Sequence, residues 1–290
     1  MNLRHVIHPF TCHVTANLPH NGGNTFIIRV SQRLLVAMDI FSEMAGVYDI
    51  IAGDCSPYYN ALLSAIRARY PRLEDAILAD IGGGTGLFTF HICHRVKSVL
   101  LMDPSDAMLS VAREKFDRYA CDNVRLARGR LPGSGLDADS VDIVVLIGTF
   151  QYLSREEHPE ALRDIYRCLK PGGLAFVDLV NYFAFIGQPV GPEMKRWKAK
   201  SLKIMQKTSH EVHPLQEAWI DNYRITVENT VDGSLKEFES RHMLKMLSPT
   251  EMCLLLRMAG FSSVEVTHWP DVVCGPDVKI WCFAKKPDTL

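Results

Sequence analysis

A turn of four glycines within five positions constrains this chain more than any other stretch. It follows the short apolar run 77–81, which carries Asp80, and apolar residues at helical spacing begin directly after it. Strand, glycine turn and helix start therefore follow one another. Without Cβ atoms the backbone N–H groups can approach a ligand, and the helix N-terminus adds the positive end of a dipole. The stretch predicts a nucleotide-type cradle formed by Asp80, Gly82, Gly83, Gly84 and Gly86.

A second acid, Asp103, ends the apolar run 99–102, 21 positions after Gly82. An acid at the end of the second strand accepts hydrogen bonds from the hydroxyls of a bound ribose. Enzymes that bind nicotinamide dinucleotides share this acid, but their fingerprint requires a glycine at position 87, where Leu87 stands. The two acids and the glycine spacing indicate nucleoside binding and disfavour a nicotinamide cofactor.

The pattern Asp-x-Gly-x-Gly-x-Gly over residues 80–86 resembles the first motif of the class I S-adenosylmethionine (SAM) dependent methyltransferases. The resemblance implies that SAM binds at the glycine turn, and that Pro104 and Met108 contact it, with Met108 packing on the adenine. Core packing is the other interpretation of Met108. Family members often carry Gly-Asp in the third loop, whereas this chain has Gly129 and Arg130. Adenine recognition is therefore expected from backbone groups of that loop or from its neighbour Leu131.

An acid, a buried strand and a polar-aromatic exit over residues 140–153 resemble the family's fourth motif, whose exit faces the transferred methyl group. This implies that Gly148 contacts the cofactor. The substrate-binding candidates are Thr149, Phe150, Gln151 and Tyr152. The Asp/Asn-Pro-Pro-aromatic sequence typical of enzymes that methylate nucleic-acid bases is absent from this exit. Ahead of the glycine turn, Tyr48 is expected either over the cofactor cleft, as in small-molecule methyltransferases, or as a half-buried aromatic at a helix end.

Alternating strand and helix patterns predict an α/β fold. It is a Rossmann-like, doubly wound, mostly parallel seven-stranded sheet with an antiparallel last strand, plus a helical N-terminal cap and an inserted lid. The core strands are expected at 77–81, 98–103, 123–127, 141–147 and 173–180, and the closing strands at 264–268 and 279–284. Helices are expected at 86–96, 105–118 and 155–169, with a further one that starts at a capping box from Ser248 to Glu251.

Five parts of the chain follow from this pattern. They are an N-terminal arm (1–30), the helical cap (31–72), the SAM-binding core (73–180), a lid or acceptor-cap insertion (181–245) and the C-terminal part of the core sheet (246–290). In the arm, residues 26–30 are expected to form either a short strand or only an apolar lead-in to the cap. In the insertion, residues 191–207 are expected to form a basic helix, and residues 219–241 a hairpin with its turn at Asp232 and Gly233.

Composition sets the remaining limits. The net charge of −1 provides no general attraction for phosphate backbones, which argues against a nucleic-acid partner. No apolar run reaches membrane-spanning length, and the eight cysteines contain no Cys-x-x-Cys pair. We therefore expect a cytoplasmic chain with neither a membrane partner nor a metal site. Irregular spacing also disfavours a metal site at the N-terminal histidines, which are His5, His8, His13 and His20.

The expected activity is transfer of a methyl group from SAM to a nitrogen, oxygen or carbon nucleophile of a small molecule, in specialised metabolism, with S-adenosylhomocysteine (SAH) as product. A base is needed only if the acceptor keeps its proton. None is singled out among the candidates His158, His210, His213 and His242. A SAM-binding protein with another activity, such as a cyclase, and a nicotinamide oxidoreductase stay open as alternatives. A lid hairpin and a free arm would suit a homodimer.

Overall fold

The computed structural model describes residues 6–8, 11–16, 26–28, 39–185, 191–268 and 279–288, with side chains from residue 41 onward. Three short strands of the expected arm form an antiparallel sheet in the order β1-β2-β3. They are β1 Val6–His8, β2 Thr11–Ala16 and β3 Phe26–Ile28, the last within the strand expected at 26–30. The interpretation of the N-terminal histidines falls outside the described side chains. Among the described helices, none is both long and apolar enough to cross a membrane.

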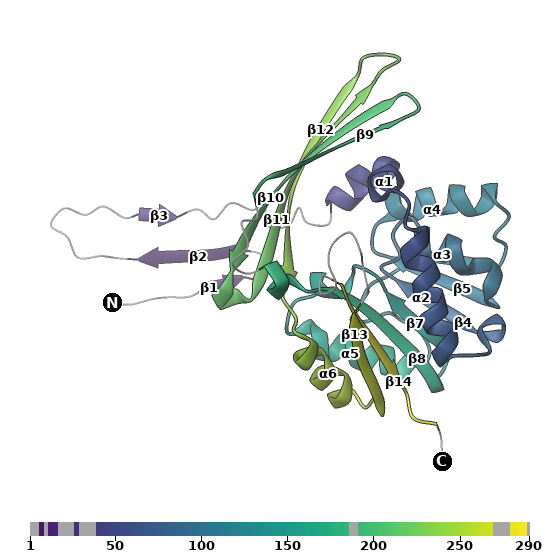
Figure 1. Cartoon of the computed structure of the whole chain (residues 1–290). Helices are drawn as coiled ribbons and strands as arrows, with labels where there is room; N and C mark the ends of the chain where they lie inside the picture. The colour runs from purple at the N-terminus through teal and green to yellow at the C-terminus, as the bar shows by residue number, and fades with distance from the viewer. Residues whose placement is uncertain are drawn as a thin grey trace.

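One sheet of seven strands forms the centre of the molecule, in the order β13-β14-β8-β7-β4-β5-β6 (Figure 1). Strand β14 runs antiparallel to both of its neighbours, and the other neighbouring pairs are parallel. This arrangement confirms the predicted doubly wound sheet with an antiparallel last strand. Its strands are β4 Ile77–Ile81, β5 Ser98–Asp103, β6 Val124–Arg128, β7 Val141–Leu146, β8 Leu169–Val180, β13 Ser263–His268 and β14 Lys279–Lys285.

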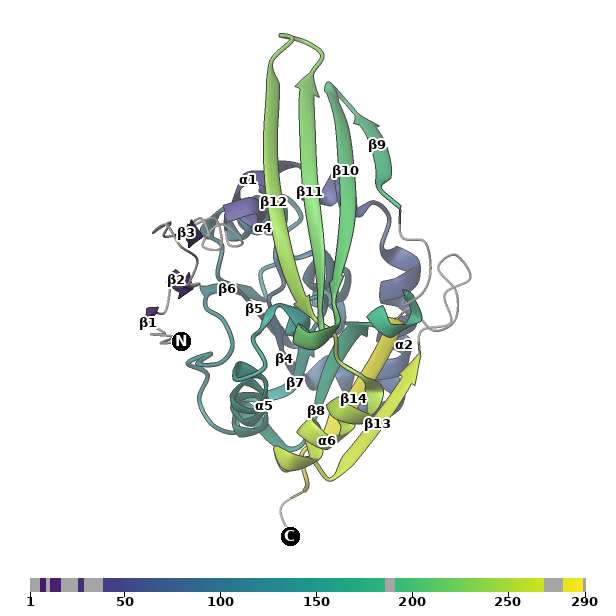
Figure 2. The same cartoon turned by 90° about the vertical axis from the view of Figure 1, so that its left-hand side faces the viewer.

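Helices cover both faces of this sheet (Figures 1 and 2). Successive side chains of a strand point to opposite faces, so Leu78 packs in one apolar cluster with helices α2, α3 and α4, while Ala79 packs in a second with α5 and α6. All six residues of β7 are buried, as expected for a central parallel strand. The helices are α2 Ser56–Arg69, α3 Leu87–Ile92, α4 Asp106–Arg118, α5 Glu157–Cys168 and α6 Pro249–Met258.

Two serines cap helices of the core. Ser105 Oγ accepts the Met108 N–H at the start of α4, and Ser248 Oγ accepts the Glu251 N–H at the start of α6, as the capping box predicted. Helix α5 ends at Cys168, close to the expected end at 169, and β8 begins at Leu169, ahead of the expected start at 173.

The insertion after β8 is a four-stranded antiparallel sheet in the order β12-β11-β10-β9. The predicted helix at 191–207 is therefore wrong, whereas the hairpin with its turn at Asp232 and Gly233 is confirmed. The helix-like spacing of the lysines hid a two-residue period. In β10, Ile204 and Thr208 are buried on one face with Gln206 partly buried between them, whereas Lys203 and Lys207 are exposed on the other. The strands are β9 Glu193–Ala199, β10 Leu202–His213, β11 Ala218–Asn229 and β12 Leu235–Lys245.

Helix α1 (Asp39–Ala52) lies between the inserted sheet and α4 (Figure 1). Met44 and Val47 of α1 share one apolar cluster with Met108 of α4 and with Ile204 and Ile225 of the inserted sheet. The insertion is therefore packed onto the core through α1, so this helix links the two parts. Helices α1 and α2 both fall within residues 31–72, the range expected for a helical cap, and α2 packs against the core sheet.

The glycine turn after β4 adopts backbone conformations and contacts that require glycine. Gly84 and Gly86 have φ values of +57° and +76°. A Cβ on Gly86 would lie 2.5 Å from the Phe116 ring and 2.9 Å from Leu101, whereas a Cβ on Gly84 would meet nothing within 4 Å. Both positions need the left-handed backbone, but only Gly86 is also closed in by α4 and β5.

We predict that Gly86→Ala destabilises the protein more than Gly84→Ala. The left-handed backbone costs an alanine about 1–2 kcal/mol at either position. At Gly86 the overpacking against Phe116 adds about 1–3 kcal/mol. Chemical denaturation gives the two free energies of unfolding, and equal losses would contradict the close approach described above.

Asp80 supplies a second prediction, because its carboxyl group is buried inside the turn. It is 1% exposed and accepts a hydrogen bond of 2.7 Å from Thr89 Oγ1. Burial raises the pKa of Asp80 from 3.8 to about 6, with the Asp103 carboxylate adding to the shift. Because the pKa of Asp80 is higher in the folded state than in the unfolded state, the free energy of unfolding of the protein decreases as pH rises from 3.8 to about 6.

We expect Asp80→Asn to remove this loss. The variant's advantage in unfolding free energy over the unmodified protein should grow across that pH interval and reach about 3 kcal/mol at neutral pH. Denaturation at a series of pH values measures the difference, and the other carboxyl groups cancel in it. A difference that stays constant from pH 4 to pH 7 would show that Asp80 titrates normally.

Candidate functional site

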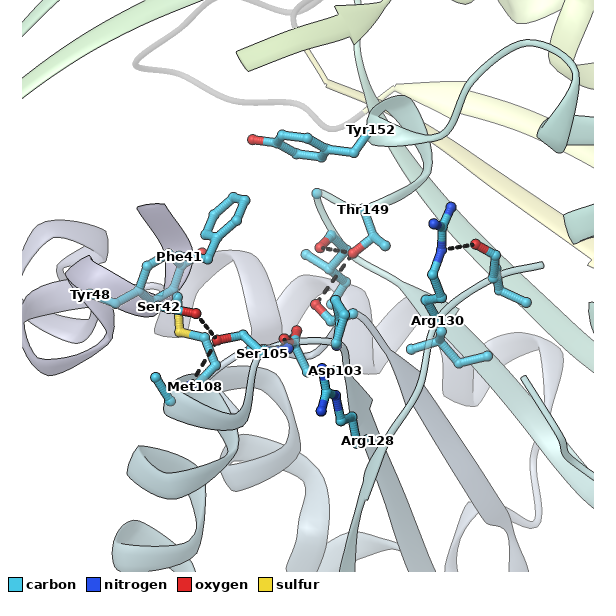
Figure 3. Close-up of a pocket in the computed structure, with 18 of the residues that line it drawn as sticks. Phe41, Ser42, Tyr48, Asp103, Ser105, Met108, Arg128, Arg130, Thr149 and Tyr152 are labelled. Atoms are coloured by element: carbon cyan, nitrogen blue, oxygen red, sulfur yellow. Dashed lines mark hydrogen bonds between the residues drawn. The ribbon is translucent and has the colours of Figure 1, made fainter. Parts of the chain in front are cut away.

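A cavity of about 660 Å³ opens at the carboxyl ends of β4, β5 and β7 (Figure 3). The chain leaves β4 toward β5 on one side and returns to β7 on the other, so the cavity lies at the switch point where open α/β sheets bind ligands. The predicted site residues that line it are Tyr48, Gly82, Gly84, Asp103, Pro104, Met108, Arg130, Leu131, Gly148, Thr149 and Tyr152. Other lining residues, which the sequence did not single out, include Phe41, Ser42, Ser105, Arg128 and Lys279.

Asp103 is the carboxylate at the floor of the cavity. Its Oδ2 accepts the Gly84 N–H and its Oδ1 accepts the Ser105 N–H, both at 2.9 Å. Burial raises the pKa of Asp103, against the lowering effect of these two hydrogen bonds. A carboxylate has about four acceptor positions, so Asp103 can take two further donors from a ligand. This is the chemistry that a ribose needs.

Helix α1 closes one side of the cavity and is tied to the cofactor loops. Ser42 Oγ lies 2.9 Å from Ser105 Oγ. Asp49 accepts Thr85 Oγ1 at 2.6 Å and forms an ion pair of 2.7 Å with Lys115. These contacts bring the Tyr48 ring to the cavity wall, where it is half-buried. Burial raises the pKa of Tyr48 to about 12, with the Cys55 thiol and the Asp103 carboxylate adding to it.

The loop after β6 carries Leu131 and Arg130 to the cavity. The Arg130 Nε donates to the carbonyl of Leu131 at 3.0 Å, and its guanidinium pairs with Glu157. The positive charge is thus already matched, and the buried Leu131 supplies an apolar surface. Gly129 does not line the cavity; a Cβ there would lie 2.6 Å from Met102 Sδ.

The exit of β7 divides its residues between the cavity and the core. Thr149 and Tyr152 line the cavity, but Phe150 and Gln151 of the short helix η4 (Phe150–Tyr152) point away from it. Phe150 is fully buried and stacks on His158 at 4.6 Å. Gln151 donates to the carbonyls of Val180 and Lys245 and accepts the Val180 N–H. The structure therefore places Phe150 in the core, and Gln151 among the contacts that join the core to the insertion.

Other predicted residues stand behind the cavity wall. Asp80, Gly83 and Gly86 shape the turn without lining the cavity. The Gly148 N–H donates to Asp178, a buried carboxylate that also accepts Tyr58 Oη at 2.8 Å and Lys279 Nζ at 2.7 Å. Sequence analysis missed Asp178, because an acid inside an apolar strand gives no spacing signal of its own.

One group of potential metal ligands lies elsewhere in the described part of the chain. Cys93 Sγ and Cys121 Sγ are 3.2 Å apart, and the ligand atoms of Cys93, His94 and Cys121 all lie within 4.8 Å of one another. Spacing could not reveal this group, since its cysteines are 28 residues apart in the chain. The neighbouring Asn123 side chain donates hydrogen bonds to the carbonyl oxygens of Cys93 and Val96. These residues precede β5 and β6 in the chain, so the group lies at the amino ends of those strands, at the opposite sheet edge from the cavity.

These features fit SAM. Gly84 faces open space at the cavity, where a ligand can approach the backbone. Asp103 offers free acceptor positions beside it, and Met108 and Leu131 add apolar surface for a base. The residues that would hold the cofactor therefore come from the loops after β4, β5 and β6.

Comparison with known proteins agrees with this fit. Residues 78–173 match a family model described as a methyltransferase domain. The ubiquinone/menaquinone biosynthesis C-methyltransferase of Idiomarina loihiensis is 31% identical over 53% of this chain, and the chain spans 62% of that enzyme's length. A SAM-dependent methyltransferase from Clostridium acetobutylicum superposes with a TM-score of 0.66 at 16% identity, covering 86% of this chain and 99% of that one.

SAM-bound CalS10, an amino pentose methyltransferase from Micromonospora echinaspora, superposes with a TM-score of 0.64 at 18% identity, covering 83% of this chain and 95% of the other. At such identity the structural likenesses establish the fold, while the matched family model identifies the domain at residues 78–173. The glycine turn, the acid after β5 and the antiparallel last strand lead to the same assignment: this chain carries a class I SAM-dependent methyltransferase domain.

Proposed function

We propose that the chain transfers the methyl group of SAM to a nitrogen, oxygen or carbon nucleophile of a small molecule, in specialised metabolism. The observation that carries this proposal is a single cavity that extends from Asp103 to Tyr152 (Figure 3). Its volume of about 660 Å³ lies in the range of about 300–1,000 Å³ usual for small-molecule sites. The cavity is thus large enough for a cofactor and a small acceptor together.

We assign the cofactor side of the cavity to the loops after β4, β5 and β6. Asp103 accepts the ribose hydroxyls, the turn at Gly82 and Gly84 approaches the polar tail, and Met108 and Leu131 pack on the adenine. Bound there, SAM supplies a methyl group already activated by its sulfonium charge. Thr149, Tyr152 and the α1 residues Phe41 and Tyr48 then line the acceptor side.

The chain's own contribution is alignment. Loops held by buried hydrogen bonds fix the positions of both reactants, and such positioning is worth on the order of 7–11 kcal/mol. The names of the matched enzymes, a quinone C-methyltransferase and an amino pentose methyltransferase, support a small-molecule acceptor. The net charge of −1 supports it too, because a nucleic-acid substrate would favour a basic surface.

We predict that Asp103→Ala weakens binding of both SAM and SAH by about 10- to 100-fold, since it removes hydrogen bonds to a charged group. Gly84→Ala should weaken both as well, because its methyl group would enter the cavity. Titration calorimetry measures the affinities. Asp117→Ala, an exposed acid on α4, is the matched control and should bind normally. Binding of NADH in place of SAM would contradict the assignment.

Methyl transfer itself is tested by SAH release with a panel of amino sugars, phenols, hydroquinones and amino acids. Release that depends on one acceptor, and that falls in Asp103→Ala in step with SAM affinity, supports the proposal. Tight SAM binding with conversion of SAM to a product other than SAH would instead favour the alternative activity, that of a SAM-binding protein with different chemistry.

A further inference from the structure

The inserted sheet carries a buried polar cluster beside the acceptor end of the cavity. Asp221 of β11 is 7% exposed and accepts three hydrogen bonds: from Trp219 Nε1 and His210 Nδ1, each at 2.5 Å, and from Tyr223 Oη at 2.9 Å. Three of the roughly four acceptor positions of its carboxylate are therefore taken within the sheet. Hydrogen bonds of this kind hold the buried charge in position beside its neighbours.

His242 of β12 lies directly opposite Asp221 in the strand register. It is 2% exposed, and its Nδ1 lies 3.3 Å from Tyr152 Oη. Its Nε2 is buried without a hydrogen-bond partner in the described structure. Burial lowers the pKa of His242 to about 4, against the pull of the Asp221 carboxylate. The imidazole is therefore neutral at neutral pH and has one nitrogen that can accept a proton.

Tyr152 connects this imidazole with the cavity. It lines the cavity and keeps 40% of its surface exposed. The His242 ring packs edge-on against Tyr152 at 5.6 Å and against Phe41 at 5.2 Å, both of them lining residues. His242 thus does not line the cavity itself but lies directly behind the Tyr152 side chain. It reaches an acceptor only through the Tyr152 hydroxyl, which carries its proton at neutral pH.

The wall at this end selects for an uncharged ring. Phe41, Tyr48 and Tyr152 offer aromatic surface, which pairs with ring ligands in offset or edge-on contacts. The cationic side chains on the cavity lining already have carboxylate partners. Lys279 pairs with Asp178, Arg130 with Glu157 and Arg128 with Asp106. An anionic acceptor would find no free counter-charge among these groups. Of the lining carboxylates, Asp106 pairs with Arg128, and Asp103 is assigned to the ribose hydroxyls.

We propose that the acceptor is an uncharged ring bearing a hydroxyl group, and that Tyr152 takes its proton while passing its own to His242 Nδ1. This inference rests on the proposed function. The acceptor O–H bond breaks, the new bond joins that oxygen to the methyl carbon, and the proton displaced from Tyr152 remains on the imidazole. The positive charge that leaves the methyl donor reappears on His242, opposite Asp221. Tyr152 is the group that touches the acceptor, and His242 is a positioning residue that acts through it.

The test follows the His242 side-chain nitrogens by NMR in the full chain saturated with SAH, with His242→Gln used to assign them. Three probes of similar shape are titrated: phenol, toluene and benzylamine. We expect phenol to bind and to move the His242 nitrogen signals, toluene to bind without moving them, and benzylamine, a cation, to bind no more tightly than toluene.

Tyr152→Phe should abolish the shift and weaken phenol binding by about 2- to 10-fold, the equivalent of one neutral hydrogen bond, with SAH affinity unchanged. Tyr166→Phe, which packs on Phe261 away from the cavity, is the matched control and should preserve the shift. For a hydroxylated ring that the acceptor panel shows to be methylated, Tyr152→Phe should lower kcat by about 10²- to 10⁴-fold and leave the KM for SAM unchanged.

The proposal is overturned if phenol binds without moving the His242 signals, if benzylamine binds most tightly, or if none of the probes binds while SAH does. In these cases the cofactor assignment stands. Failure of SAH to bind overturns the proposed function itself, so the two failures are distinguishable.

Discussion

Buried carboxylates at the ends of three core strands determine the shape of the site, because a charge removed from water must find donors within the protein. Asp103 at the end of β5 takes the N–H groups of Gly84 and Ser105, and Asp178 near the end of β8 takes that of Gly148. Asp80 in β4 takes the hydroxyl of Thr89. The loops around the cavity therefore adopt conformations that satisfy these acids, and the cavity is the space between loops fixed in this way.

Much of this arrangement is predictable from the sequence because it depends on local signals. The glycine turn, the acid after β5 and the apolar runs of the core strands each occupy a few consecutive residues, and the structure brings them together at one sheet edge. Alternation of strand and helix then determines the order of the strands. The closing pair β13 and β14 also follows from its own pattern, in spite of the long insertion before it.

The parts that sequence reasoning missed depend on contacts between distant segments. Strands β9 and β10 looked helical because their lysines recur at helical spacing, and only pairing with β11 reveals the two-residue period. At the exit of β7, the sequence pattern makes all four residues 149–152 substrate-binding candidates. The tight turn of η4, however, sends Phe150 and Gln151 into the protein and leaves Thr149 and Tyr152 at the cavity. His242 is one of several isolated histidines in the sequence. Like His210 it lies opposite Asp221 in the strand register, and its contact with Tyr152 distinguishes it from the rest.

Helix α1 belongs to both halves of the site at once. Ser42 and Asp49 bond to the loops on the cofactor side, while Met44 and Val47 pack against the inserted sheet on the acceptor side. The two sides of the cavity are for this reason not independent, because one rigid helix contributes to both of their walls. A substitution that shifts α1 would therefore alter the cofactor side and the acceptor side together.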